Sequence, residues 1–484
     1  MDHSRAPVLE ALQAFRDQGF TPFNPPGHRQ GRGVDERVLE IVGAAVFASD
    51  VIAVNGLDDR RVSQGVLAHA QELMADAVHA DHAFFSTCGS SLSVKSAMLA
   101  VAGPHEKLLV ARQSHKSVIS GLVLSGVAPV WVRPQWDGEL HLSHPPSADE
   151  VRRRFADEPD AKGMLLVTPT DYGTCGDIKA IADVCHELGK PLIVDEAWGA
   201  HMPFHPDLPP WAMDADADLC VTSVHKSGAA VEQSSVFHLQ GDRVDPAVLA
   251  ARADLLGTTS PSSLVYATLD GWRRQMVEQG EVLLGAALDL AHETRAALAE
   301  LPGVQVMGKE FVGQDAAMSI DPLKIVLDVS ALDISGYQAA DWLRENERVT
   351  VGLSDHRRVV AHLTIADDET SAATLLHAIA GLTKADLPSP HPVRLPSPAE
   401  LELETAMLPR DAFFAATEQV AATDAVGRVS AEMLTPYPPG APAVLPGEVI
   451  TTEVLDYLRS GLTAGMQLPD PVDAELDSVR VVAR

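Results

Sequence analysis

The chain has 484 residues, of which 46% are hydrophobic and 21% charged, a composition ordinary for a globular protein with room for two or three domains. Its formal net charge of −30 argues against a nucleic-acid-binding surface, which needs a basic patch. The four cysteines show no CxxC spacing, no apolar run reaches the roughly 18–20 residues of a membrane span, and the first residues show no signal-peptide pattern. We therefore expect a cytoplasmic protein with reduced thiols that binds neither nucleic acid nor membrane.

The first 62 residues are predicted to form an N-terminal arm. Residues 8–15 have a helical pattern, whereas residues 21–33 contain three prolines and three glycines, which rule out regular structure. Residues 50–60 are typical of an extended segment that ends in a turn.

Residues 63–275 are predicted to form a large α/β domain. Helical patterns cover residues 64–78, 91–101, 115–124, 148–155 and 178–188. Strand patterns cover residues 107–111, 129–132, 163–167, 192–194, 219–221 and 234–238. Strands that alternate with helices indicate a mostly parallel central sheet covered on both faces.

The rest of the chain is predicted to form a small domain, a linker and a C-terminal domain. A long helical pattern over residues 264–301 leads into a smaller α+β domain, assigned to residues 276–386. Its strands are expected at 303–307, 324–329, 349–353 and 359–365, and its helices at 337–345 and 371–382. Residues 387–397 contain four prolines and are typical of a linker. The C-terminal domain, 398–484, has two helical stretches around the proline-rich residues 436–448.

Two predicted strands end in residues that could carry chemistry. Asp195 follows the apolar run 192–194, and Lys226 follows the run 219–221 together with Ser223 and His225. Parallel strands deliver such groups to one edge of an open α/β sheet. A carboxylate that pairs with a pyridinium nitrogen and a lysine that forms a Schiff base are what pyridoxal phosphate (PLP) requires. Alone, each residue is as readily explained as a surface charge or a helix cap.

Three further patterns bear on the site. Gly89, Ser90 and Ser91 precede a helix, so their N–H groups and hydroxyls suit a phosphate, although the same residues also make an ordinary N-cap. His115 follows another predicted strand. His201 and His205 have HxxxH spacing, but the proline between them makes a shared helix face improbable, so no metal site is predicted.

Taken together, these segments resemble the PLP-dependent Orn/Lys/Arg decarboxylase family, which has the aspartate-aminotransferase fold (fold type I). The segments that carry the resemblance are Pro26-Gly27-His28, Gly56-Leu57-Asp58-Asp59, the turn 85–91, Ser114-His115-Lys116-Ser117, Asp195-Glu196-Ala197-Trp198 with His201, Ser223-Val224-His225-Lys226, the stretch 258–262, Asp321-Pro322-Leu323-Lys324, residues 409–414, and 437–440 with 446–448. The resemblance implies an α/β fold, PLP as the cofactor, and a form without the N-terminal wing domain of the large members. A homodimer or tetramer with active sites at the subunit interface is then expected.

The chain departs from the family pattern at three places. Cys88 replaces the usual Asn of the phosphate turn, residues 170–173 read TDYG where the family has TYDG, and Asn24 stands where a His is common. These departures bear on substrate identity rather than on PLP binding.

The resemblance implies PLP-dependent decarboxylation of lysine, ornithine or arginine to cadaverine, putrescine or agmatine, which is a step of polyamine synthesis. Lys226 would carry the cofactor, Asp195 would pair with its ring nitrogen, and His115 would stack on the ring. The phosphate would be held by the turn at 89–91, Ser223 and His225, with Thr259 supplied by the other subunit, and Lys226 or His225 would return the proton. Ala197 and Trp198 complete the expected cofactor site.

Glu448 is a candidate partner for the substrate's distal cation, a role held equal to that of a surface acid. Two alternatives to the decarboxylase reading remain. One is another fold-type-I enzyme, such as an aminotransferase or a lyase, and the other is an inactive PLP-binding homologue.

Overall fold

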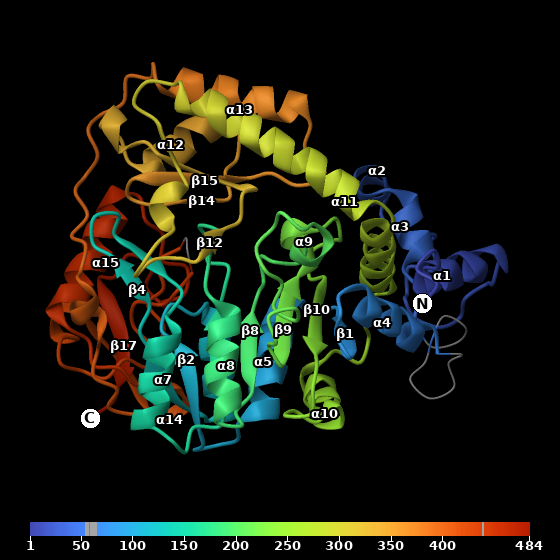
Figure 1. The fold of residues 1–484 in the computed structure, drawn as a ribbon, viewed down its shortest axis with the longest axis horizontal. Helices are drawn as coiled ribbons and strands as arrows, with labels where there is room; N and C mark the ends of the chain where they lie inside the picture. Colours follow the sequence, from blue (N-terminus) through green and yellow to red (C-terminus); the bar gives the residue numbers. More distant parts are fainter. Residues whose placement is uncertain (54–57, 59–64, 438–439) are drawn as a thin grey trace. The chain divides into compact units, whose positions relative to one another are not determined.

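The computed structural model describes residues 1–53, 58, 65–437 and 440–484 (Figure 1). Most of the predicted motif at 56–59 therefore lies outside the described residues, as do Pro438 and Pro439. The chain forms two compact units. The first unit contains residues 1–100 and 193–284, and the second contains residues 101–192 and 285–484.

The first unit combines helices with four strands. Its helical elements are α1 (Pro7–Asp17), α2 (Glu36–Val42), α3 (Ala44–Ser49), α4 (Val66–Ala77), α5 (Gly89–Val101), the 3-10 turn η1 (Met202–Phe204), α9 (Val224–Ser227), α10 (Pro246–Leu256) and the start of α11 (Ser263–Ala299). Its strands are β1 (His82–Ser86), β8 (Leu192–Asp195), β9 (Leu219–Ser223) and β10 (Ser235–Leu239), in the spatial order β1–β10–β9–β8 (Figure 1).

The strand directions determine which strand ends lie at the same edge of the sheet. β8 runs parallel to β9, with Asp195 opposite Val221. β10 runs antiparallel to both β9 and β1. Every residue of β8, β9 and β10 is buried, as expected for strands covered on both faces. The carboxyl ends of β8 and β9 therefore lie side by side.

In the second unit, three parallel strands and an antiparallel sheet are the main β-structures. The strands β2 (Lys107–Ala111), β3 (Ala128–Val132) and β6 (Met164–Val167) run parallel in the order β6–β2–β3. The antiparallel sheet has the order β11–β13–β15–β14 and consists of β11 (Gln305–Met307), β13 (Lys324–Asp328), β14 (Leu353–Ser354) and β15 (Arg358–His362). Shorter pairs are β4 (Gln135–Asp137) with β5 (Leu142–His144), β7 (Thr174–Cys175) with β12 (Ser319–Ile320), and β16 (Thr417–Ala421) with β17 (Ser478–Val482).

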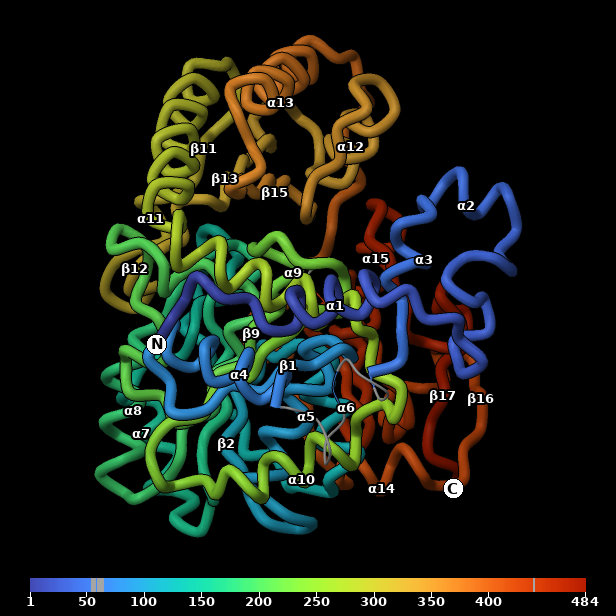
Figure 2. The backbone as a smooth tube through the Cα atoms, turned by 90° about the vertical axis from the view of Figure 1, so that its right-hand side faces the viewer, coloured from blue at the N-terminus to red at the C-terminus, as the bar shows by residue number. Residues whose placement is uncertain are grey.

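The helices of the second unit begin where the sequence supplies caps. They are α6 (Lys116–Ser125), α7 (Ala148–Asp157), α8 (Ile178–Glu187), the rest of α11, α12 (Gly336–Trp342), α13 (Glu369–Leu382), α14 (Pro409–Phe414) and α15 (Thr452–Ala464). Ser147 and Thr451 accept hydrogen bonds from the first turns of α7 and α15, and Ser335 forms a capping box with Gln338 at α12. Figure 2 shows α12 and α13 grouped with the β11–β13–β15 strands.

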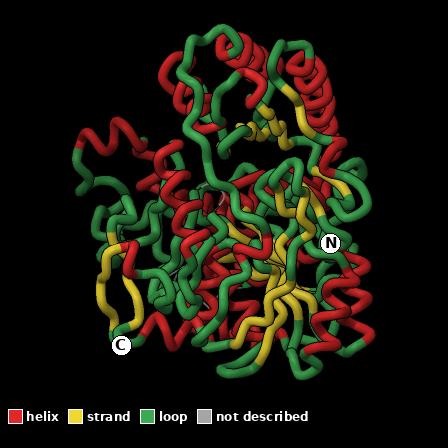
Figure 3. The backbone as a smooth tube through the Cα atoms, turned by 90° about the vertical axis from the view of Figure 1, so that its left-hand side faces the viewer, coloured by secondary structure: helices red, strands yellow, loops and turns green. Residues whose placement is uncertain are grey.

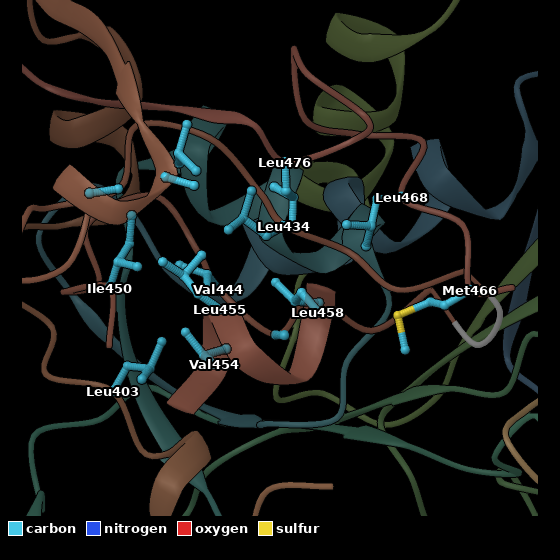
Figure 4. Close-up of a cluster of buried hydrophobic side chains, with 14 of the residues drawn as sticks. Leu403, Leu434, Val444, Ile450, Val454, Leu455, Leu458, Met466, Leu468 and Leu476 are labelled. Atoms are coloured by element: carbon cyan, nitrogen blue, oxygen red, sulfur yellow. The ribbon is translucent and has the colours of Figure 1, made fainter. Parts of the chain in front are cut away.

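The C-terminal part of the second unit has its own hydrophobic core. Figure 4 labels ten side chains of this core. Among them, Leu455 and Leu458 come from α15, and Leu434 and Val444 come from the surrounding loops. The pair β16–β17 closes this part next to the C-terminus (Figure 3). This strand pair was not predicted: β16 (TEQVA) has no alternation of apolar and polar side chains, and the short alternating run of β17 (SVRVV) was not assigned to a strand.

Most predicted elements are present within a few residues of the expected positions. The expectation of a mostly parallel arrangement holds for β6–β2–β3 and β8–β9, whereas β10 is antiparallel. Strand β1 and helix α10 were not assigned from the sequence. Residues 21–33 have neither helix nor strand, as predicted.

Candidate active site

Residues 89–91, the turn predicted to bind a phosphate, form the start of α5. Ser223, the last residue of β9, donates a hydrogen bond from its hydroxyl to Ser90 Oγ at 2.6 Å. Gly89 has a φ of +73°, which favours glycine, and a Cβ added there would meet nothing within 4 Å. The first turn of α5 therefore presents N–H groups that have no acceptor within the helix, two hydroxyls and open space at Gly89, which suit an anion. Ser91 is exposed and Cys88 is half-buried beside this turn.

Asp195 is the last residue of β8 and is only 5% exposed. Backbone hydrogen bonds fix the residues after it to the neighbouring strand. Glu196 N–H donates to Val221 O at 2.9 Å, and Ser223 N–H donates to Ala197 O at 3.2 Å. The predicted Asp195 and Ser223 are thus held at adjacent strand ends by the main chain.

Lys226 lies in the short helix α9 and is half-buried. Its Nζ lies 4.5 Å from the centroid of the Trp198 ring. Ser227 Oγ donates to Trp198 O at 2.8 Å, which ties the turn after β8 to α9. A Cβ at Gly228 would lie 2.7 Å from Val224 O and 2.8 Å from the Trp272 ring, so only glycine fits after this helix.

The His225 side chain has a defined proton position. Its Nδ1 lies 3.1 Å from Ser234 O, and because a carbonyl only accepts, Nδ1 must carry the proton. His225 Nε2 is then an acceptor when the ring is neutral. Gly89 N–H likewise donates to a backbone carbonyl, that of Gln233, at 2.9 Å. The role of residues 233 and 234 in the site was missed from the sequence because they act through main-chain oxygens, which leave no sequence signal.

Glu196, adjacent to Asp195, is held in a different state. It is 1% exposed, and its Oε2 accepts hydrogen bonds from Ala212 N–H at 3.2 Å and from the Cys220 thiol at 3.3 Å. Burial raises the pKa of Glu196 well above its usual range, and also raises the pKa of the Cys220 thiol. Burial thus favours the neutral form of Glu196, and its contacts are structural.

His115 lies in the second unit, directly before α6. Its Nδ1 accepts a hydrogen bond from Ser117 N–H at 3.2 Å and lies 2.9 Å from Ser117 Oγ, so the ring caps the helix. The proton of the neutral ring is consequently on Nε2. The carbonyl of Gly440 accepts from Lys116 N–H at 3.2 Å.

Glu448, the predicted partner of the substrate's cation, also lies in the second unit and is 2% exposed. Its carboxylate lies 3.3 Å from Arg112 Nη2 and accepts from Leu445 N–H at 2.9 Å. Burial raises the pKa of Glu448, and the Arg112 charge and the Leu445 N–H oppose that rise. Arg112 and Glu448 form part of the wall of a cavity of about 570 Å³ in the second unit. The cation-binding role of Glu448 stays a prediction.

The remaining predicted residues are placed as follows. Thr259 is exposed in the loop between α10 and α11, so its expected role toward a second subunit stays a prediction. His201 and His205 flank the 3-10 turn η1, so they do not share an α-helical face. In the TDYG stretch, the Tyr172 hydroxyl donates to Asp355 Oδ2 at 2.6 Å.

The cofactor-binding residues predicted in the first unit fit PLP by their donor chemistry. Gly89 and Ser90 at the start of α5, with Ser223 beside them, offer donors that suit a phosphate; Asp195 offers a buried carboxylate, and Lys226 offers an amine beside an aromatic face. Among the described residues, no group of three or more His, Cys, Asp or Glu side chains could hold a metal ion. Likewise, the described part of the chain has no helix long and apolar enough to cross a membrane.

Comparison with known proteins gives the same family along the whole chain. The family model for the Orn/Lys/Arg decarboxylase major domain matches residues 6–371, and the model for the C-terminal domain of that family matches residues 398–471. The arginine decarboxylase of Bacillus subtilis (strain 168) is 36% identical over 487 residues, which cover 100% of this chain and 99% of that protein.

Solved structures agree on the fold. The constitutive lysine decarboxylase of E. coli aligns with a TM-score of 0.81 at 20% identity, covering 100% of this chain and 82% of that one. A structure of SPT with PLP aligns with a TM-score of 0.51 at 15% identity, covering 74% of this chain and 84% of that one. The fold is therefore the α/β fold of PLP-dependent fold-type-I enzymes, and the chain belongs to the Orn/Lys/Arg decarboxylase family of enzymes.

Proposed function

We propose that the chain is a PLP-dependent decarboxylase that converts a basic amino acid into its amine and CO2, with arginine as the first substrate to test. The observation that carries the proposal is the set of residues at the ends of β8 and β9, where the main chain holds Asp195 and Ser223 side by side and Lys226 follows in α9 beside the Trp198 ring. The full-length similarity to an arginine decarboxylase supports arginine over lysine and ornithine.

Each residue of the site has a physical role in this proposal. The first turn of α5 with Ser90, Ser91 and Ser223 would bind the phosphate, and Lys226 Nζ would hold the cofactor's aldehyde carbon. Bound PLP supplies an electron sink for the electron pair left when the carboxylate departs as CO2. Asp195 would keep the proton on the pyridine nitrogen, because a buried carboxylate beside it favours the charged ring.

The protein must then return a proton to the substrate's Cα. Lys226 Nζ and His225 Nε2 are the two candidates for this proton transfer. His225 Nδ1–H is engaged by Ser234 O, so His225 could return a proton only from Nε2, and only when the ring carries a second proton there. His115 would lie against the cofactor ring and orient it. Trp198, against which Lys226 Nζ lies, would limit the directions open to the amine.

The test is release of CO2 and amine from PLP-loaded protein that is offered arginine, lysine and ornithine separately, with Lys226→Ala as the control. We expect agmatine and CO2 from arginine, and loss of both in the variant. A keto acid in place of CO2 would point to an aminotransferase. No turnover of any of the three, with PLP still bound, would support an inactive homologue.

Thr259 gives a test of the proposed shared active site in a homodimer. If Thr259 contacts the phosphate bound by the other subunit, Thr259→Glu would repel that phosphate and inactivate the enzyme. Mixed dimers of Thr259→Glu and Lys226→Ala would then regain activity, because one of their two sites has both wild-type residues. Absence of any regain in confirmed mixed dimers would exclude this role for Thr259.

A further inference from the structure

The turn that carries His115 is held from both sides by the C-terminal segment 440–448. Arg112, three residues before His115, donates hydrogen bonds to Pro442 O at 3.0 Å and to Ala443 O at 3.3 Å. Lys116, the residue after His115, donates its N–H to Gly440 O at 3.2 Å. The two attachments flank His115 in the sequence, so they restrict the position of its backbone.

A buried ion pair anchors the first of these attachments. Arg112 Nη2 lies 3.3 Å from Glu448 Oε2, and the Arg112 guanidinium also lies 5.4 Å from the centroid of the Trp131 ring. Glu448 in turn accepts from Leu445 N–H at 2.9 Å, which closes the segment on itself. A carboxylate that is 2% exposed depends on such partners, because an unpaired buried charge is strongly unfavourable.

The space beside the His115 imidazole leaves little room for a side chain at position 440. A Cβ on Gly440 would lie 3.3 Å from His115 Cδ2, which is tighter than most Cβ contacts. The opposite edge of the ring accepts from Ser117 N–H at 3.2 Å. The imidazole therefore has a hydrogen bond at Nδ1, and any side chain at position 440 would approach it at Cδ2. Gly440 also has a φ of +85°, a conformation that favours glycine.

We propose that the segment 440–448 positions His115 for the reaction, with Arg112, Glu448 and Gly440 as positioning residues that act through this turn. The inference rests on the proposed function, in which His115 lies against the PLP ring. A ring that orients a cofactor must be held to within a fraction of an ångström. The helix cap at Ser117 fixes one edge of the imidazole, and the C-terminal segment adds a further constraint through the backbone on both sides of His115.

This role for Glu448 makes a different kinetic prediction from substrate binding. A residue that binds the substrate's distal cation equally in ground state and transition state affects KM when it is removed. A residue that positions His115 affects kcat and the environment of the bound cofactor, whichever substrate is offered.

The first test is Gly440→Ala, with Gly427→Ala as the matched control. Both glycines have a positive φ, +85° and +75°, but a Cβ at Gly427 would meet nothing within 4 Å. Both variants therefore carry backbone strain, and only Gly440→Ala presses on His115. We expect the visible circular dichroism of bound PLP to change and kcat to fall roughly 3- to 30-fold in Gly440→Ala alone.

Crystal structures of the same two variants without cofactor give a readout that needs no turnover. The His115 ring should be displaced in Gly440→Ala and unmoved in Gly427→Ala. Equal behaviour of the two variants in ring position, circular dichroism and kcat would overturn the proposal. If the wild-type protein releases no CO2 from any of the three amino acids, the proposed function fails, while ring position and circular dichroism still decide this inference.

The second test is Glu448→Gln, with Glu402→Gln as the control. Glu402 pairs with Arg133 at the surface and lines the same cavity, and its side chain is 43% exposed. We expect Glu448→Gln to lower kcat roughly 10- to 100-fold with little change in KM, and to change the cofactor's circular dichroism. Glu402→Gln should change neither. A rise in KM for arginine with unchanged kcat and circular dichroism would assign Glu448 to substrate binding and overturn the positioning role.

Discussion

His238 makes the stability of the first unit sensitive to acid. It lies in β10 opposite Cys220 of β9, is 2% exposed and packs edge-on against Trp211 at 5.3 Å between ring centroids. Burial lowers the pKa of His238 from 6.5 to about 3. The folded state keeps the ring neutral at a pH where the unfolded chain already binds a proton. Stability is therefore fully present above pH 6.5 and falls as the pH drops toward 3.

The size of this effect follows from the shift. Each pKa unit corresponds to about 1.36 kcal/mol, so acidification from about pH 7.5 to about pH 5 should cost about 2 kcal/mol through His238 alone. In His238→Phe this contribution is absent, because phenylalanine fills the site without a titratable group. The wild-type free energy of unfolding should therefore fall by about 2 kcal/mol more than that of the variant over the same interval.

Urea unfolding of wild type and His238→Phe at both pH values, with saturating PLP, measures this difference. Phe237→Leu is the control, since Phe237 is a buried neighbour that does not titrate, and its cost should be equal at the two pH values. Equal acid sensitivity of wild type and His238→Phe would refute the reasoning and place the proton elsewhere.

Three further variants follow from the same structure. Ser90→Ala removes the acceptor of the Ser223 hydroxyl at the anion-binding turn, so the PLP dissociation constant should rise roughly 3- to 10-fold in a spectroscopic titration of the apoprotein. Burial raises the pKa of Glu196 in the folded state, so the wild type loses stability as the pH rises above about 4.5, where the unfolded chain ionises first. Glu196→Gln lacks this loss, so its stability relative to wild type should be greater at about pH 8 than at about pH 5 in thermal melting. Tyr172→Phe removes a donor to the buried Asp355 and should lower the free energy of unfolding by about 1–3 kcal/mol, measured by urea unfolding.

The strand-end residues could be predicted because their positions follow from a simple local pattern. Short apolar runs ending in polar residues gave Asp195 and Ser223 at the carboxyl ends of β8 and β9, and the structure places them there. Lys226 follows in α9, three residues beyond Ser223. No long-range information was needed, since parallel neighbouring strands share the edge at which they end.

Contacts that depend on distant segments or on the main chain could not be predicted. Arg112 and Glu448 are separated by 336 residues, and neither periodicity nor spacing links two such positions. The carbonyls of Gln233 and Ser234 bind Gly89 and His225, yet any residue type offers a carbonyl. The antiparallel direction of β10 could not be predicted either, because a fully buried strand shows the same apolar run whichever way it is oriented in the sheet.

Asp195 and Glu196 show where local sequence reasoning ends. The two adjacent residues carry the same functional group, and composition gives no reason to assign them different states. Side chains at successive positions leave a strand on opposite faces. Glu196 is directed to Ala212 N–H and the Cys220 thiol, where burial raises its pKa well above the usual range. A carboxyl whose neutral form is favoured is poorly suited to stabilise a positive ring nitrogen, so Asp195 at the end of β8 is the candidate for the proposed cofactor.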